Sequence, residues 1–268
     1  MAQKSKQWAA IIMMIALFAM IAFVTNLCSP MATIVKNQFG ASELAGQIGN
    51  YANFIAYLVM GIPSGMLIAK LGYKKTALLA LIVGIVGIVF EYLSGVVGSY
   101  VIYLVGAFIS GLCMCMLNTV VNPMLNTLGG GGNKGNQLIQ LGGSLNSLAA
   151  TIVPVFVGYL MGDVASARIS DANPALFIAM AIFALAFVII FFSAIPEPEL
   201  EAAKAAPAKE SEGVVASVKG ALSHNNLLFG IIAIFVYVGV EVGIPNIANL
   251  YMTSGAEHGG LGIATGTA

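Results

Sequence analysis

The 268-residue chain has very few charged residues. Its 11 Lys or Arg and 11 Asp or Glu make up 8% of the sequence, whereas water-soluble domains are typically about a quarter charged. A composition this poor in charge cannot cover a water-soluble surface. The charges also cancel to a formal net charge of zero, and nucleic-acid binding depends on a surplus of positive charge. The sequence therefore predicts no nucleic-acid partner.

Metal-ligating and nucleophilic residues are also scarce, with 3 cysteines and 2 histidines in the whole chain. Cys113 and Cys115 are two residues apart on a predicted helix, where their side chains point in different directions. No nucleophile is paired with a base, and the glycine run at 129–132 lacks the GK[ST] of a phosphate-binding loop. We therefore predict no metal, no cofactor and no enzymatic activity.

The chain is instead rich in hydrophobic residues, which make up 59% of it and gather into long runs. A bilayer's hydrocarbon core is about 30 Å thick and a helix rises about 1.5 Å per residue, so a helix needs about 20 apolar residues to cross it. The predicted spans are Trp8–Cys28, Gly49–Ala69, Thr76–Val96, Val101–Leu125, Leu138–Leu160, Ala175–Ala194 and Leu227–Met252. This pattern predicts an all-α polytopic membrane helix bundle.

The basic residues predict how the bundle is oriented, because Lys and Arg near helix ends stay preferentially on the cytoplasmic side. Lys36 and Arg168 lie in one set of connections. The other basic residues precede the first span or lie in the alternate connections: Lys4, Lys6, Lys70, Lys74, Lys75, Lys134, Lys204, Lys209 and Lys219. We therefore expect an inner (plasma) membrane protein with a cytoplasmic N-terminus and, after seven crossings, an outer C-terminus.

A long polar connection divides the chain. Residues 196–226 begin with an Ala, Glu, Lys and Pro-rich stretch and are predicted to form a cytoplasmic linker. Residues 1–195 would form a six-helix bundle, and 227–268 one further helix with an outer tail. Near the end of the linker, apolar residues recur at helical spacing from Val214 to Leu222, which predicts a short helix on the inner membrane surface.

Polar side chains inside the spans are the candidate functional residues, since each costs free energy in lipid unless it faces protein or water. The candidate ligand-binding residues are Asn26, Asn50, Asn53, Tyr57, Asn118, Asn122, Gln140, Asn146, Asn246 and Asn249. One interpretation is hydrogen bonding between helices, which contributes about 0.6 to 2 kcal/mol per contact. The other is a shared cavity for a neutral ligand rich in hydroxyl groups, such as a sugar, because amides both donate and accept hydrogen bonds.

Glu241 is the acidic residue nearest the middle of a predicted span, where an ionised carboxylate costs at least about 2.5 kcal/mol. We interpret it either as a proton carrier or as a partner for amides on neighbouring helices. Glu91, near the outer end of the third span, is interpreted as interfacial. Pro30 and Pro245 each follow a polar residue by four positions, the weak internal symmetry expected of parallel repeats in a transporter.

The connection between the second and third spans carries a recognisable motif. The segment Gly65-Met-Leu-Ile-Ala-Lys-Leu-Gly72-Tyr-Lys-Lys75 resembles the conserved loop of the major facilitator superfamily, although Ala69 stands where that loop usually has aspartate. Its predicted gating residues are Gly65, Lys70, Gly72, Lys74 and Lys75. More narrowly, four short motifs look like those of the fucose and glucose/galactose proton symporters: IPSG at 62–65, VNP at 121–123, LNS at 145–147 and YVGVE at 237–241.

The resemblance implies a twelve-helix transporter with two six-helix halves, alternating access and proton-coupled uptake of a monosaccharide. The residues it places around the cavity are Asn50, Tyr57, Asn122, Asn146 and Glu241. Three positions depart from the fucose symporters: Ser29 and Asn118 stand where those proteins carry acids, and Gly143 stands in place of a glutamine. The resemblance therefore does not extend to fucose as the substrate or to the usual route of the proton.

Seven spans are about half of such a transporter plus one helix. Either the remaining helices have been lost or the reading frame is cut short, and we expect the chain to need a second copy or the missing C-terminal half as its partner. Two alternatives stay open. One is a transporter of another neutral polar solute, such as a nucleoside or peptide; the other is a seven-helix receptor, which the cytoplasmic N-terminus disfavours.

Overall fold

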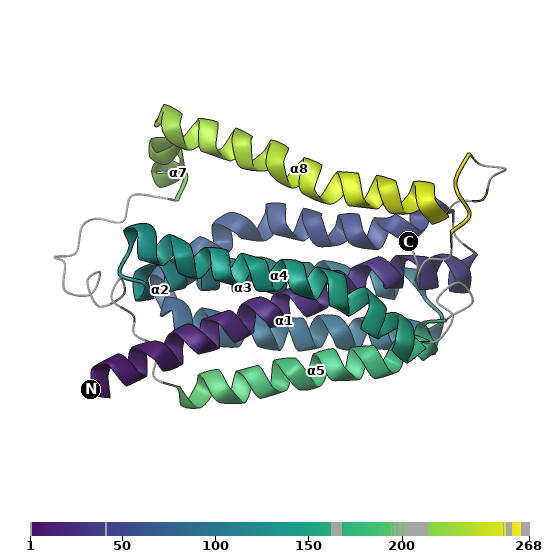
Figure 1. Ribbon diagram of the computed structural model, residues 1–268, viewed down its shortest axis with the longest axis horizontal. Coiled ribbons are helices and arrows are strands. Elements are labelled where there is room, and N and C mark those ends of the chain that lie inside the picture. The colour runs from purple at the N-terminus through teal and green to yellow at the C-terminus, as the bar shows by residue number, and fades with distance from the viewer. Residues whose placement is uncertain are drawn as a thin grey trace. The chain divides into compact units, whose positions relative to one another are not determined.

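The computed structural model describes residues 2–40, 42–161, 168–193 and 214–253, together with residues 195, 197, 200, 255 and 259–263. Nearly all of these are helical and none of them is in a strand, so the predicted all-α bundle is confirmed. The helices (Figure 1) are α1 (Ala2–Phe39), α2 (Glu43–Val97), α3 (Tyr100–Leu128), α4 (Gly132–Met161), α5 (Ile169–Phe192), α7 (Val214–Leu222) and α8 (Asn225–Thr253).

Helix α2 contains two of the predicted spans. Its 55 residues would stretch about 80 Å as one straight helix, more than twice the thickness of the hydrocarbon core. The helix is broken at Gly72, whose φ of 83° and ψ of 173° are not helical, and the chain folds back there (Figure 1). We call residues 43–71 the first arm of α2 and residues 73–97 the second arm.

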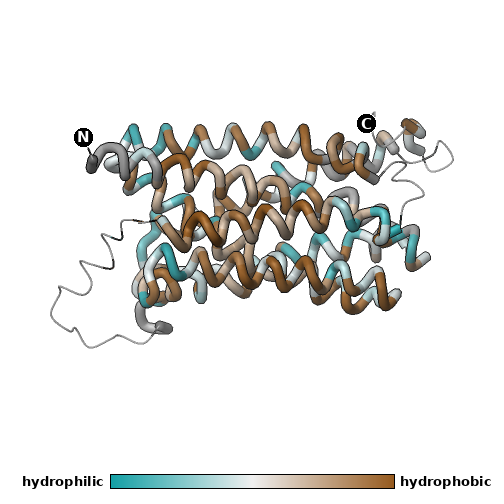
Figure 2. Tube along the Cα trace, turned by 90° about the horizontal axis from the view of Figure 1, so that it is seen from below, coloured by the Kyte–Doolittle hydropathy of each residue, from teal (hydrophilic) through white to brown (hydrophobic). Residues whose placement is uncertain are grey.

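Among the described residues, α1 to α5 are long and apolar enough to cross a bilayer, with α2 long enough to do so twice. Figure 2 shows hydrophobic residues along the middle of these helices. Helix α5 begins at Ile169, before the predicted start of its span at Ala175, because the carboxylate of Asp171 accepts the main-chain N–H of Arg168 at 2.8 Å and caps the first turn.

The chain separates into two units, Met1–Ala203 and Lys204–Ala268. The first contains α1 to α5, and its core lies around α3, in which every side chain from Cys113 to Leu117 is buried. The second contains α7, at the position that the sequence predicts for the short linker helix, and α8. The tail of the second unit returns to the end of α8, where the N–H of Leu261 bonds to the carbonyl oxygen of Tyr251 at 3.0 Å.

The second arm of α2 packs very closely against α3 at two glycines. A Cβ built on Gly87 would lie 2.7 Å from the backbone nitrogen of Ser110, and one built on Gly106 would lie 2.8 Å from that of Glu91. Only glycine fits at two such points. This close contact, which we call the glycine seam, holds the two helices in a fixed register.

Candidate functional site

Two of the candidate ligand-binding residues meet where the first arm of α2 lies along α3. The side-chain amide of Asn118 donates a hydrogen bond to the phenolic oxygen of Tyr57 at 2.9 Å, and both groups are partly buried. One turn before Tyr57, the side-chain oxygen of Asn53 lies against Gly111 of α3, where an added Cβ would be 2.5 Å away. These contacts place Asn53, Tyr57 and Asn118 along one line of contact between the two helices.

Three further candidate amides make their hydrogen bonds within their own helices. Asn122 donates to the carbonyl oxygen of Asn118 at 3.0 Å, Asn50 to the side chain of Gln47 at 2.7 Å, and Asn26 to the carbonyl oxygen of Ala22 at 2.7 Å. Each of these bonds uses one of the two hydrogens that a carboxamide offers. Bonds of this kind orient an amide within one helix. They therefore do not support the interpretation that these residues link one span to another.

Helix α4 presents a polar face that is exposed in the first unit. Its hydroxyl groups bond to carbonyl oxygens one turn earlier in the same helix: Ser144 to Gln140 at 2.9 Å, Ser147 to Gly143 at 3.1 Å and Thr151 to Ser147 at 3.2 Å. Gln140 is itself exposed, and Asn146, at the side of this face, is partly buried. The hydroxyl groups are satisfied within the helix, whereas the exposed carboxamide of Gln140 needs water or protein beside it and not lipid.

The remaining candidate residues lie on α8, in the second unit. Glu241 is exposed there and is the single charged residue of the helix. Asn246 and Asn249 follow it on the same helix, and their side chains lie outside the described residues.

The loop at Gly72 is held by residues from the far end of the first unit. The main-chain N–H of Lys74 donates to the Glu197 carboxylate at 2.9 Å, while the Lys74 ammonium donates to the carbonyl oxygens of Phe191 and Ser193, both at 2.8 Å. The anion therefore caps the start of one helix and the cation caps the end of another, as helix dipoles favour. Gly72 contacts the same Glu197 carboxylate.

Two of the five predicted gating residues thus form this joint, Gly72 and Lys74. The other three, Gly65, Lys70 and Lys75, are exposed. Sequence reasoning did not single out Glu197, because it lies in the predicted linker and its partner is 123 residues away. The sequence feature that could have identified Glu197 is its position as the first acidic residue after the sixth span.

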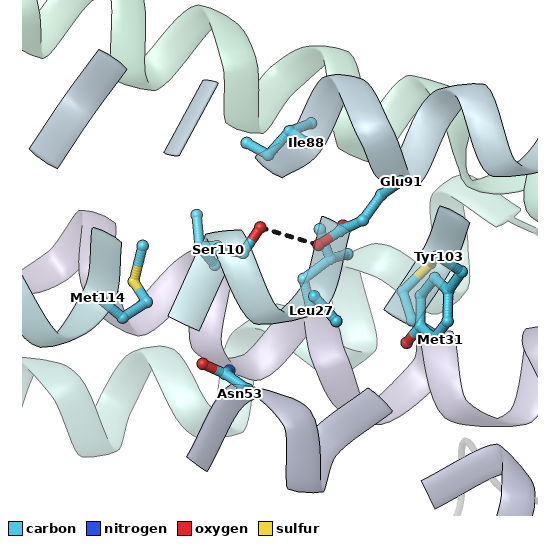
Figure 3. A pocket seen from close by; sticks show the side chains of 10 residues that line it. Leu27, Met31, Asn53, Ile88, Glu91, Tyr103, Ser110 and Met114 are labelled. Atoms are coloured by element: carbon cyan, nitrogen blue, oxygen red, sulfur yellow. Dashed lines mark hydrogen bonds between the residues drawn. The ribbon is translucent and has the colours of Figure 1, made fainter. Parts of the chain in front are cut away.

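Glu91 is not interfacial, as the sequence analysis expected, but buried, with 7% of its surface exposed. Its carboxylate accepts a hydrogen bond from the hydroxyl group of Ser110 at 2.9 Å (Figure 3). The interpretation was wrong because the glycine seam brings α3 over this part of α2 and covers the side chain. The glycines at 87 and 106 were the signal, since small residues allow close helix packing.

Among the described residues, no three His, Cys, Asp or Glu side chains are grouped so that they could hold a metal ion. The groups that do meet are carboxamides, hydroxyls and a phenol. They donate and accept hydrogen bonds without carrying charge, which suits the binding of a neutral polar molecule.

The sequence matches the family model of the Major Facilitator Superfamily over residues 12–268. A glucose/galactose transporter from Brucella abortus is 27% identical over 255 residues, which cover 90% of this chain and 60% of that protein. A putative glucose/galactose transporter from Helicobacter pylori is 29% identical over 252 residues, which cover 90% of this chain and 59% of its own length. The chain thus spans about three-fifths of the length of these relatives.

Two solved structures have a similar fold. The crystal structure of the transporter FucP in the outward conformation has a TM-score of 0.73 at 21% identity, covering 90% of this chain and 62% of the other. That of a variant of the Escherichia coli fucose:proton symporter has a TM-score of 0.69 at 20% identity, covering 90% and 63%. At these identities the likeness concerns the fold.

Proposed function

The chain belongs to the major facilitator superfamily, a family of membrane transporters and not of enzymes. From this premise we propose that it is part of a secondary active transporter, which imports a monosaccharide by alternating access and is driven by protons. In this proposal residues 1–195 are the six-helix bundle, 196–226 the cytoplasmic linker and 227–268 the start of a second bundle. The carrier lies in the inner membrane with a cytoplasmic N-terminus. The second bundle is completed by further helices or by another copy of the chain.

The observation that carries the proposal is the hydrogen bond between Asn118 and Tyr57, at 2.9 Å. A carboxamide and a phenol that bond to each other across two helices can each exchange that bond for one to a sugar hydroxyl, because both donate and accept. A bound sugar would thus change the contact between the first arm of α2 and α3. The names of the Brucella and Helicobacter relatives, both glucose/galactose transporters, support a hexose.

Additional polar groups extend this site along the bundle. Asn50, Asn53 and Asn122 lie on the same two helices as the bonded pair, Gln140 lies on the polar face of α4, and Asn146 lies beside that face. Uncharged groups of this kind also suit another neutral polar solute, such as a nucleoside or a peptide, which stays the second candidate. A receptor is not retained, since the family consists of transporters.

In this proposal Glu241 couples proton movement to transport. It is the single charged residue in α8, and a carboxylate in a membrane span is costly unless it serves an ion pathway or a partner. Asn246 and Asn249, on the same helix, are the candidate ligand-binding residues of the second bundle.

The test is uptake by cells that lack their own hexose carriers and express the protein from its own locus, with everything that this locus encodes. We expect accumulation of labelled glucose or galactose, and its loss when an uncoupler removes the proton gradient. A panel of labelled nucleosides and peptides separates the second candidate. If none of these solutes accumulates while the protein is present in the membrane, the proposal fails.

A further inference from the structure

Glu91 is enclosed inside the first unit by three helices. It lies on the second arm of α2, and Ser110 of α3 donates to its carboxylate at 2.9 Å. Its main-chain nitrogen and side-chain Cγ are pressed against Gly106, where an added Cβ would lie 2.8 and 2.9 Å from them. The backbone and the first part of the side chain of Glu91 are thus held closely against α3.

A small cavity of about 10 Å³ lies beside this carboxyl group (Figure 3), about the space that one water molecule needs. Leu27 and Met31 of α1 form an apolar wall, and Tyr103 of α3 and Asn53 of the first arm of α2 complete the polar part of the lining. The cavity gives the carboxyl group room for a proton or a single water, and no room for a sugar.

Among the described residues that line the cavity there is no lysine or arginine. Tyr103 is the other titratable group in the described lining. Further titratable or charged groups on the helices around it include Tyr92 on the same arm, Tyr100 and Cys113 of α3, Lys36 of α1, and Arg168 and Asp171 where α5 begins, the last two both exposed. Within the lining, the Ser110 hydroxyl is thus the neutral donor that the structure gives to the Glu91 carboxylate. A buried carboxylate without a cation costs free energy, and a bound proton removes that cost.

Asn53 connects this cavity to the proposed sugar site. It lines the cavity beside Glu91, its side-chain oxygen lies against Gly111, and it is one turn from Tyr57 on the same arm. A ligand that replaces the bond between Tyr57 and Asn118 would move this arm relative to α3. Such a movement would displace Asn53 and open the cavity to water, which stabilises the charged form of a carboxyl group.

From this arrangement we propose that Glu91 is a proton-binding site within the first bundle, which holds a proton while the first arm of α2 lies against α3 and releases it when that contact opens. The site is separate from Glu241 on α8. A role of the Glu91 site in sugar transport rests on the proposed function, whereas proton binding at this site does not.

Infrared spectroscopy of the full chain in lipid vesicles tests proton binding directly, because a protonated carboxyl group has a carbonyl stretching band that a carboxylate lacks. At neutral pH we expect this band in the wild-type protein and its loss in Glu91→Gln. It should disappear reversibly in alkaline buffer. The matched control is Asp171→Asn, which removes an exposed acid at the start of α5 and should leave the band unchanged.

A second variant covers the case in which Glu91→Gln does not fold. Ser110→Ala removes the hydrogen bond and should raise the frequency of the same carbonyl band. The proposal is overturned if folded Glu91→Gln keeps the wild-type band, if the band persists in alkaline buffer until the protein unfolds, or if Ser110→Ala leaves its frequency unchanged.

Transport measurements separate this inference from the proposed function. In Glu91→Gln we expect exchange of labelled hexose across the membrane to continue, while accumulation driven by the proton gradient is lost. Undiminished accumulation in this variant would exclude a part for the site in coupling. If the wild-type protein exchanges no sugar, the proposed function fails, and the infrared titration alone decides whether Glu91 binds a proton.

Discussion

The carboxylate of Glu197 accepts the main-chain N–H of Lys74 at 2.9 Å, although the two residues are 123 positions apart in the chain. The segment that leaves α5 is thereby fastened to the loop between the arms of α2. The Lys74 ammonium completes the joint by donating to the carbonyl oxygens of Phe191 and Ser193. The loop inside α2 and the segment that follows α5 are therefore held at one place.

Lys74→Met should weaken this joint. The variant loses two charge-assisted hydrogen bonds at the end of α5, and we expect it to lower the free energy of unfolding by about 1 kcal/mol, because the contacts are partly exposed. Thermal unfolding of the protein in detergent measures the effect. Lys75→Met is the matched control, since Lys75 is exposed and adjacent. Equal effects of the two substitutions would show that the joint adds no stability.

Gly72→Ala should be more damaging. The φ of 83° and ψ of 173° at Gly72 are a conformation that essentially only glycine adopts, and an added Cβ would meet the Glu197 carboxylate. We expect a loss of about 1 to 3 kcal/mol in the free energy of unfolding. The control is Gly61→Ala, where a Cβ would meet nothing within 4 Å. A Gly72→Ala protein as stable as this control would contradict the geometry of the loop.

Tyr57→Phe should affect sugar binding more than folding. It removes the phenolic oxygen that accepts from Asn118, and one neutral hydrogen bond corresponds to about a 2- to 10-fold loss in apparent affinity for the transported sugar. Concentration-dependent uptake or binding of labelled hexose measures it. Tyr159→Phe on α4 is the control, because that tyrosine is exposed. An unchanged affinity in Tyr57→Phe would remove this pair from the sugar site.

A cysteine in place of Ser147, on the polar face of α4, should react with a water-soluble thiol reagent. The expected reaction is faster than that of Leu185→Cys, whose side chain lies exposed on α5 among hydrophobic residues and faces lipid in the proposed arrangement. Labelling is measured against the parent protein, whose Cys113 and Cys115 are buried. If the position at 147 reacts no faster than that at 185, the face does not line a water-filled cavity.

Much of the fold follows from residues close together in the sequence. Apolar runs of sufficient length predict the spans, and the spacing from Val214 to Leu222 predicts the short helix α7, because both patterns arise within single helices. The resemblance to the major facilitator superfamily is confirmed by the family model. These features need no knowledge of how one helix meets another.

The details of the site depend on contacts between helices, and the sequence did not reveal them. It placed Tyr57 and Asn118 on polar stripes without indicating that they bond to each other. It assigned Glu91 to the interface because depth along a helix was counted and the approach of α3 was not. The bond from Lys74 to Glu197 was missed for the same reason, since it joins distant segments.

The glycine seam makes the second arm of α2 and α3 one rigid unit. Gly87 and Gly106 bring the two backbones into near contact at two separate points, and sliding by a single residue would drive the Cβ atoms of neighbouring residues into the opposite chain. In the proposed opening, the second arm of α2 and α3 would therefore stay together, and the first arm of α2 would be the segment that moves.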